Sequence, residues 1–316
     1  MRTDRIFALF LIAACLLAAL SGWWRAPRER ASTSLTMDGA GSAQVAIIDV
    51  YGTIADGTPD EGLFGSRAAS ATRLIKAIRS AEKDQVKAIL LRINSPGGTA
   101  AASQMVYEEL MRLRKAGKIK IVTGMGDVTA SGGYYIAAAS DHIVANPATT
   151  TGSIGVILHV QNVQKLFDKL GIGETTIQSG PRKDILSPFR PMRPDERAIL
   201  QALVDDTYQQ FLSAVVAGRK MPLDKIKPLA DGRVFTGSQA QKVGLVDSLG
   251  NYQDALTKAA SLAGIKGEPK TRNYTSGSFF EGVFPRLESK LPGWASSLLA
   301  HEPKAGWNKI PLTLME

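Results

Sequence analysis

The chain has 316 residues, of which 44% are hydrophobic and 21% charged, and it carries a formal net charge of +9. These values fit a globular protein of one large or two modest domains and exclude a disordered, collagen-like or polytopic membrane chain. The positive charge does not indicate a nucleic-acid partner, because the lysines and arginines are spread along the chain without a basic run or an RNA-binding or zinc-finger motif.

The first segment is an uncharged apolar run at residues 6–24, which ends in two tryptophans and is followed by three arginines before residue 31. At about 1.5 Å per residue, a helix of this length reaches roughly 28 Å, close to one hydrocarbon thickness. Residues 1–30 are therefore predicted to form a membrane anchor with one N-terminal transmembrane helix, and a cleaved secretory signal is the alternative. The residues before Cys15 resemble a lipoprotein processing box, but the apolar run continues past the cysteine, so we interpret the match as coincidence.

Residues 31–43 are small and polar and predict a flexible linker to a folded domain that begins at residue 44. The hydrophobic spacing then alternates between strand and helix, at 44–50 (strand), 69–81 (helix), 86–93 (strand), 105–113 (helix) and 119–123 (strand). Such alternation predicts an α/β domain with a mostly parallel sheet.

A long helix is predicted to begin at Pro194 and to end near Gly218. Its apolar face is expected to be core or a subunit contact and consists of Leu200, Leu203, Val204, Phe211, Leu212 and Val215. Residues 266–316 are rich in Lys, Ser, Gly and Pro and predict a weakly structured tail with one amphipathic stretch, which touches membrane, a neighbouring subunit or the core.

Two turns carry residues suited to chemistry. The sequence NSPGG at 94–98 follows a predicted strand, and its proline and glycines allow backbone N–H groups to face a ligand, although an ordinary tight turn is the alternative. The sequence TASGGYYIAAAS at 129–140 places Ser131 at a helix N-terminus as a candidate nucleophile, with a simple N-cap as the alternative. It is not the GxSxG turn of other hydrolases, because Thr129 stands where the first glycine belongs.

A nucleophilic serine needs a base. The three histidines, His142, His159 and His301, have no recognisable catalytic setting, and no metal-binding motif is present, so neither a metal nor a cofactor is predicted. Lys183, in SGPRKDILSPFRPM, is the remaining candidate, with a surface lysine as the alternative. A lysine that acts as a base must have its pKa lowered from about 10.4 toward 7, which costs roughly 4.6 kcal/mol and which burial can supply.

In this order and at these spacings, NSPGG, ASGGYY, TGSIGV at 151–156 and SGPRKD resemble the signal peptide peptidase A family, membrane-anchored Ser/Lys peptidases related in fold to Clp protease and crotonases. The similarity covers about residues 44–265 and implies a Clp protease/crotonase-like spiral of ββα units. It also implies roles for Ser131 as nucleophile, Lys183 as general base, Gly98 as oxyanion hole and Ser153 as the hydroxyl that orients the lysine. Gly132 is expected to add a second oxyanion donor.

The resemblance also implies partners and location. Because NSPGG and ASGGYY occur once, the chain is similar to the short form of the family, which builds homo-oligomeric rings, often of eight subunits, with serine and lysine from one subunit. The resemblance further implies that the substrates are remnant signal peptides and that the catalytic domain lies on the extracytoplasmic side of the bacterial inner membrane. The alternatives are a crotonase-like acyl-CoA enzyme, which has no use for the anchor, and a non-catalytic membrane scaffold.

Overall fold

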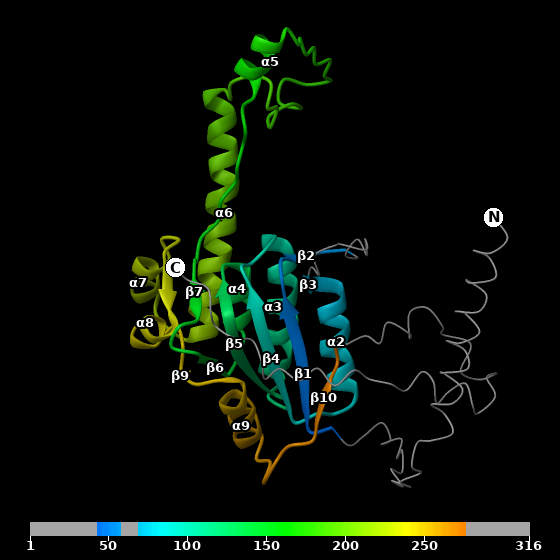
Figure 1. Ribbon diagram of the computed structural model, residues 1–316, viewed down its shortest axis with the longest axis vertical. Helices are drawn as coiled ribbons and strands as arrows, with labels where there is room; N and C mark the ends of the chain where they lie inside the picture. The colour runs from blue at the N-terminus through cyan, green and yellow to red at the C-terminus, as the bar shows by residue number, and fades with distance from the viewer. Residues whose placement is uncertain (1–42, 58–68, 276–316) are drawn as a thin grey trace, which may run out of the picture. The chain divides into compact units, whose positions relative to one another are not determined.

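The computed structural model describes residues 43–57 and 69–275, which form one unit (Figure 1). The predicted anchor, nearly all of the linker and residues 276–316 of the tail lie outside the described residues. The strands are β1 Val45–Tyr51, β2 Ile54–Ala55, β3 Ala69–Ser70, β4 Ala88–Ser95, β5 Lys120–Ala130, β6 His142–Ala145, β7 Thr150–Gly152, β8 Val234–Thr236, β9 Ser248–Leu249 and β10 Thr271–Asn273. The helices are α2 Ala71–Lys83, α3 Ala100–Ala116, α4 Gly132–Ala137, α5 Gln164–Leu170, α6 Pro194–Arg219, α7 Leu223–Ile226, α8 Gly237–Lys242 and α9 Tyr252–Leu262, with a 3₁₀ turn at Lys227–Leu229.

Six strands form a parallel sheet in the order β10-β1-β4-β5-β6-β9. The last residues of β5 also pair with β7, which in turn pairs with β8 in antiparallel fashion. Because the main strands are parallel, their carboxyl ends meet at one edge of the sheet and their amino ends at the opposite edge. The predicted α/β domain with a parallel sheet is confirmed.

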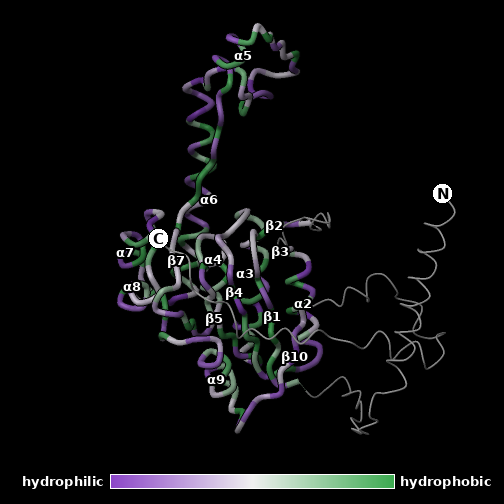
Figure 2. Tube along the Cα trace, in the orientation of Figure 1, coloured by the Kyte–Doolittle hydropathy of each residue, from purple (hydrophilic) through white to green (hydrophobic). Residues whose placement is uncertain are grey.

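The sheet is buried on both faces, as its apolar strands require. Along β4, Ile89, Leu91 and Ile93 belong to the larger core, which also contains the buried residues of α2 and α3. Ala88 and Leu90 point the other way and pack with α9. Figure 2 shows hydrophobic residues in the strands of this sheet. Alternate side chains of β4 therefore enter two different cores, one on each face of the sheet. Packing in both cores holds the strands, and with them the strand ends, in place.

Helix α6 has two different halves. Its second half is core, with Phe211, Leu212 and Val215 buried, whereas Leu203 in the first half is 55% exposed. We call residues 157–207 the arm (Figure 1). Within it only Glu196 is buried. The predicted apolar face of this helix is thus core over its second half and uncovered over its first.

Part of the predicted tail joins the sheet. Strand β10 pairs with β1 in parallel, and Gln44 N–H donates to the carbonyl of Lys270 at 2.8 Å. No helix in the described ranges has the length and apolar composition needed to cross a membrane. The run at residues 6–24, for which that role is predicted, is not among the residues described.

Candidate active site

Ser131 lies in the sharp turn between β5 and α4. Its backbone has φ +51° and ψ −121°, outside the left-handed helical region and in a conformation that residues other than glycine rarely adopt. The turn is held on both sides, because Ser131 N–H donates to the carbonyl of Gly152 and Tyr135 N–H donates to the carbonyl of Ser131, both at 2.9 Å. Tyr135 is anchored in turn by a stacked contact with Phe211 of α6, at 4.6 Å between ring centres. A strained backbone that several contacts hold in place is typical of functional turns.

The threonine that replaces the first glycine of a GxSxG turn has a structural role. Thr129 is buried, and its hydroxyl donates to the carbonyl of Ile93 in β4 at 2.7 Å. Its own carbonyl accepts from the hydroxyl of Thr151 in β7 at 2.6 Å. These two bonds join β4, β5 and β7 just below Ser131, so the nucleophile turn starts from three fixed strands.

The NSPGG turn lies directly beside Ser131. A Cβ added to Gly97 would be 2.8 Å from both Ser131 Cβ and Gly132 N, and one added to Gly132 would be 3.2 Å from Gly98 N. The buried hydroxyl of Ser95 accepts from Gly97 N–H at 3.1 Å and holds the turn. Only glycine permits this approach of two backbones.

The backbone N–H groups of Gly98 and Gly132 therefore lie next to each other, beside the serine. Neither donates a hydrogen bond to any residue that the structure describes. Gly132 opens helix α4, where N–H groups have no intrahelical acceptor. Two unused donors beside a hydroxyl can bind the oxyanion of a tetrahedral intermediate.

Ser153 directly follows β7, the strand that pairs with the last residues before Ser131. Ala130 of β5 pairs with Gly152 of β7, so Ser131 and Ser153 follow aligned residues of parallel strands. Ser153 has φ +50°, almost the same as Ser131, and its N–H donates to the carbonyl of Arg233 at 2.8 Å. Both hydroxyl-bearing residues thus leave their strands with a positive φ, at the same edge.

The two histidines that the structure describes do not contact Ser131. His142 lies at the start of β6, where its Nε2 is 2.9 Å from the hydroxyl of Ser248 and where burial lowers its pKa. His159 is exposed on the arm, and His301 is outside the described residues. Within the described ranges no lysine or histidine side chain is hydrogen-bonded to Ser131.

Lys183 lies at the far end of the arm. It is exposed, in a turn that is tied to the first turn of α6 by an Arg182–Asp195 ion pair of 3.2 Å. The helix rises by seventeen residues, or roughly 25 Å, from its start at Pro194 to Phe211, whose ring stacks on Tyr135 in the helix that follows Ser131. A single chain therefore does not bring Lys183 to Ser131, and the expectation that one subunit supplies both is not met, because the lysine is carried outward by the first half of α6.

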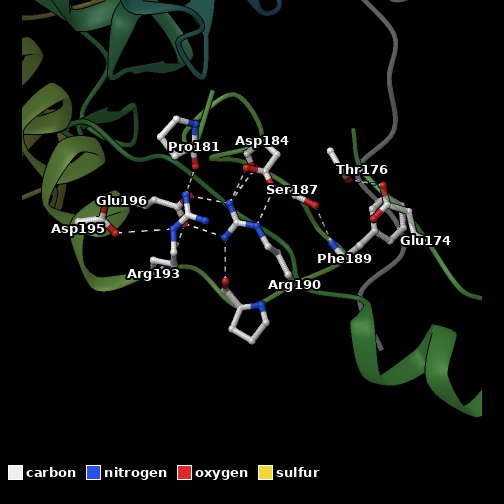
Figure 3. Close-up of polar contacts among 11 residues, drawn as sticks. Glu174, Thr176, Pro181, Asp184, Ser187, Phe189, Arg190, Arg193, Asp195 and Glu196 are labelled. Carbon is white, nitrogen blue, oxygen red and sulfur yellow. Dashed lines mark hydrogen bonds and ion pairs between the residues drawn. The ribbon is translucent and has the colours of Figure 1, made fainter. Parts of the chain in front are cut away.

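A network of ion pairs shapes the turn around Lys183 (Figure 3). Arg190 donates to both oxygens of Asp184 at 2.7 and 2.9 Å and to both oxygens of Glu196 at 2.6 and 2.8 Å. The side chain of Glu196 has no exposed surface. Hydrogen bonds from Arg190, followed by the N–H of Arg193, lower the pKa of Glu196 to about 2, and Arg190 also lowers the pKa of Asp184. The carboxylate beside Lys183 is thus occupied by arginine.

Sequence reasoning missed two contributors. Ile54 in the two-residue strand β2 accepts from Thr99 N–H and donates to the carbonyl of Gly97, both at 2.9 Å, and so fixes the NSPGG turn from the other side. Arg190 organises the Lys183 turn. Neither has a local signal, because a two-residue strand has no periodicity, and the sequence does not specify the partners of an arginine.

A strained serine at the carboxyl edge of a parallel sheet, beside two N–H donors that no described residue accepts from, is the arrangement of a hydrolase with a serine nucleophile. The Peptidase family S49 profile matches residues 113–266, and the Clp protease profile matches residues 66–151. The chain belongs to peptidase family S49, together with proteins named signal peptide peptidase SppA and Protease 4. This membership does not favour the acyl-CoA enzyme or the scaffold.

Three relatives show how far the similarity extends. A protein of Synechocystis named as a protease is 48% identical over 70% of this chain and 75% of its own length. The relative from Enterococcus faecium that carries the name signal peptide peptidase SppA is 39% identical over 87% of this chain and 76% of its own length. Protease 4 of Salmonella typhi is 38% identical over 70% of this chain, which spans only 35% of that longer relative.

Proposed function

We propose that this chain is a membrane-bound serine endopeptidase that cuts apolar peptides, remnant signal peptides among them, with Ser131 as nucleophile and Lys183 as general base. The observation that carries the proposal is the strained Ser131 turn beside the free N–H groups of Gly98 and Gly132. The name of the Enterococcus faecium relative supports the substrate class. The apolar run at residues 6–24 supports the anchor. The extracytoplasmic position is proposed from the resemblance to the signal peptide peptidase A family.

The reaction follows from these groups. The neutral amine of Lys183 takes the proton of Ser131 Oγ while Oγ attacks the peptide carbonyl carbon. The oxyanion accepts hydrogen bonds from Gly98 and Gly132, and Lys183 then gives its proton to the leaving amine. Water, deprotonated by the same lysine, attacks the carbonyl carbon of the acyl-enzyme. The ester bond to Oγ then breaks, the lysine returns its proton to Oγ, and the second product leaves as the acid. Loss of one oxyanion donor typically lowers kcat by about 100- to 1,000-fold.

We further propose that Lys183 reaches Ser131 from a neighbouring copy of the chain. In one chain the two residues are separated by the first half of α6, and Lys183 is exposed. The arm also leaves large apolar side chains uncovered, as a subunit contact requires: Leu166, Leu170, Ile177, Leu186 and Leu203. A repeated contact of this head-to-tail kind closes into a ring when its rotation allows. In such a ring, Ser153 is placed to orient the arriving amine.

The nucleophile is tested with a fluorophosphonate probe on the full chain. Wild type is expected to be labelled, and Ser131→Ala is expected to lose both labelling and hydrolysis of an apolar peptide. Lys183→Ala is expected to lower hydrolysis by about 100- to 10,000-fold, the range typical of a general base. Unchanged hydrolysis by Lys183→Ala would remove the lysine from the mechanism.

The origin of the lysine is tested by co-expression of the two inactive variants. If neighbouring copies share the site, serine from one variant meets lysine from the other, and random assembly restores up to about a quarter of wild-type activity. Co-expression of Ser131→Ala with a Ser131→Ala, Lys183→Ala double variant is the control and stays inactive. No recovery in a mixed assembly shown to contain both chains contradicts the shared site.

A further inference from the structure

The amino edge of the sheet, opposite the active site, carries a row of lysines. Backbone hydrogen bonds connect the residues that open neighbouring strands: Gln44 N–H donates to Lys270 at 2.8 Å, Lys87 N–H to Gln44 at 2.9 Å and Lys120 N–H to Lys87 at 3.1 Å. Adjacent strands are about 4.8 Å apart, so these four positions stand in line across roughly 15 Å. Lys118 and Lys266 lie in the loops that lead to β5 and β10.

We call Lys87, Lys118, Lys120, Lys266 and Lys270 the lysine edge. All are exposed except Lys120, which is half-buried. None forms an ion pair with a described residue, since every such pair involves arginine. The lysine edge is therefore a row of ammonium groups that no described carboxylate neutralises.

The carboxylates near the lysine edge are mostly occupied. Asp84 accepts from the hydroxyl of Tyr274 at 2.7 Å and pairs with Arg272 at 3.3 Å. Asp141 accepts from Arg114 at 3.1 Å and from Ile121 N–H at 2.9 Å. Glu82 is paired with Arg112 at 2.5 Å. Glu268, between Lys266 and Lys270, is an exposed acid. The charge of this edge is thus clearly positive.

The predicted linker joins the domain at this same edge, because Gln44 is both the residue after 31–43 and a member of the row. Thirteen residues reach at most about 45 Å and, as a flexible chain, about 20 Å on average. In the sequence, only these thirteen residues separate Gln44 from the arginines that follow the apolar run.

We propose that the lysine edge binds anionic phospholipid head groups of the membrane that anchors the chain. This inference rests on the anchored enzyme proposed above. Clustered lysines next to an anchor are attracted by anionic lipid within a Debye length, about 8 Å at physiological salt. Contact with lipid would fix the orientation of the sheet, with its amino edge on the membrane and Ser131 away from it.

The test uses the full chain, with Cys15→Ser and a fluorophore at Ala116→Cys, an exposed neutral position beside the lysine edge. It is placed in nanodiscs of phosphatidylcholine, with or without about 30% phosphatidylglycerol, that contain a head-group quencher. Quenching is expected to rise at least twofold in the anionic discs and to return to the neutral value in about 0.5 M NaCl.

A lysine-edge variant, with Lys87, Lys118, Lys266 and Lys270 changed to glutamine, is expected to lose this rise. Its matched control changes four exposed lysines elsewhere, Lys220, Lys225, Lys227 and Lys242, and is expected to keep it. Equal quenching in neutral and anionic discs, or an equal loss in both variants, overturns the inference. A chain that does not enter discs at all contradicts the proposed anchor instead, and labelling of Ser131 by fluorophosphonate reports separately on catalysis.

Discussion

Gly98→Ala tests the oxyanion hole directly. A Cβ at this position would lie 1.8 Å from the carbonyl oxygen of Ile54 and 2.6 Å from its carbonyl carbon, whereas real Cβ contacts are not shorter than 3.0 Å. The NSPGG turn or strand β2 must therefore move by more than about 1 Å, and a shift of this size in a catalytic group costs on the order of 100-fold. We expect kcat to fall roughly 100- to 1,000-fold, as when one oxyanion donor is lost, with a smaller change in KM.

The assay is hydrolysis of an apolar fluorogenic peptide by the full chain, with kcat and KM determined separately and the melting temperature measured alongside. Gly155→Ala is the matched control, because its Cβ would be 3.4 Å from the nearest atom, the Cα of Gly232, which is ordinary contact. We expect this control to stay within about threefold of wild type, in line with the small effect of surface changes. A Gly98→Ala enzyme with normal melting and normal kcat would refute the assignment of this N–H as an oxyanion donor.

Three further predictions concern the arm and the strained serine. Arg190→Met is expected to leave the buried carboxylate of Glu196 with Arg193 as its remaining partner and to leave Asp184 without its arginine. We expect kcat/KM to fall at least about 10-fold while the melting of the sheet is unchanged, as peptide hydrolysis and hydrogen exchange of the arm would show. The pKa of Glu196 is about 2 in the folded chain and 4.5 ordinarily, so ionised Glu196 stabilises the arm fully above pH 4.5. This stabilisation is lost as the pH falls from 4.5 toward 2, and proteolysis within the arm should increase over that interval and not above it. Ser131→Gly and Ser131→Ala are both expected to be inactive, but the glycine variant should be more stable by about 1 kcal/mol in denaturant unfolding, since it relieves the positive φ; equal stability would mean that the turn is not strained.

Much of the site could be predicted because its chemistry is concentrated in short turns. The serine and glycines of each motif follow an apolar strand directly, and parallel strands place such turns at one edge. The unusual backbone at Ser131 and Ser153 could not be predicted, because it depends on the pairing of Ala130 with Gly152 and on bonds from distant segments.

The arm shows what periodicity leaves open. The spacing of apolar residues in α6 predicts one continuous face, but it does not distinguish a surface covered by the same chain from one left for another molecule. Phe211 is buried whereas Leu203 of the same face is exposed. The prediction that Lys183 is buried by its own neighbours depended on that distinction, and the single chain leaves it exposed.

One strand, β5, connects the two edges of the sheet. It starts at Lys120 in the lysine edge and its last residue precedes Ser131. Eleven extended residues measure up to about 36 Å, so if the lysine edge rests on lipid, the scissile bond must be drawn that far above the bilayer before it is cut. The length of the sheet then determines which peptides reach Ser131. Peptides that have already come free of the bilayer can be digested, while the membrane spans of intact neighbouring proteins stay out of reach.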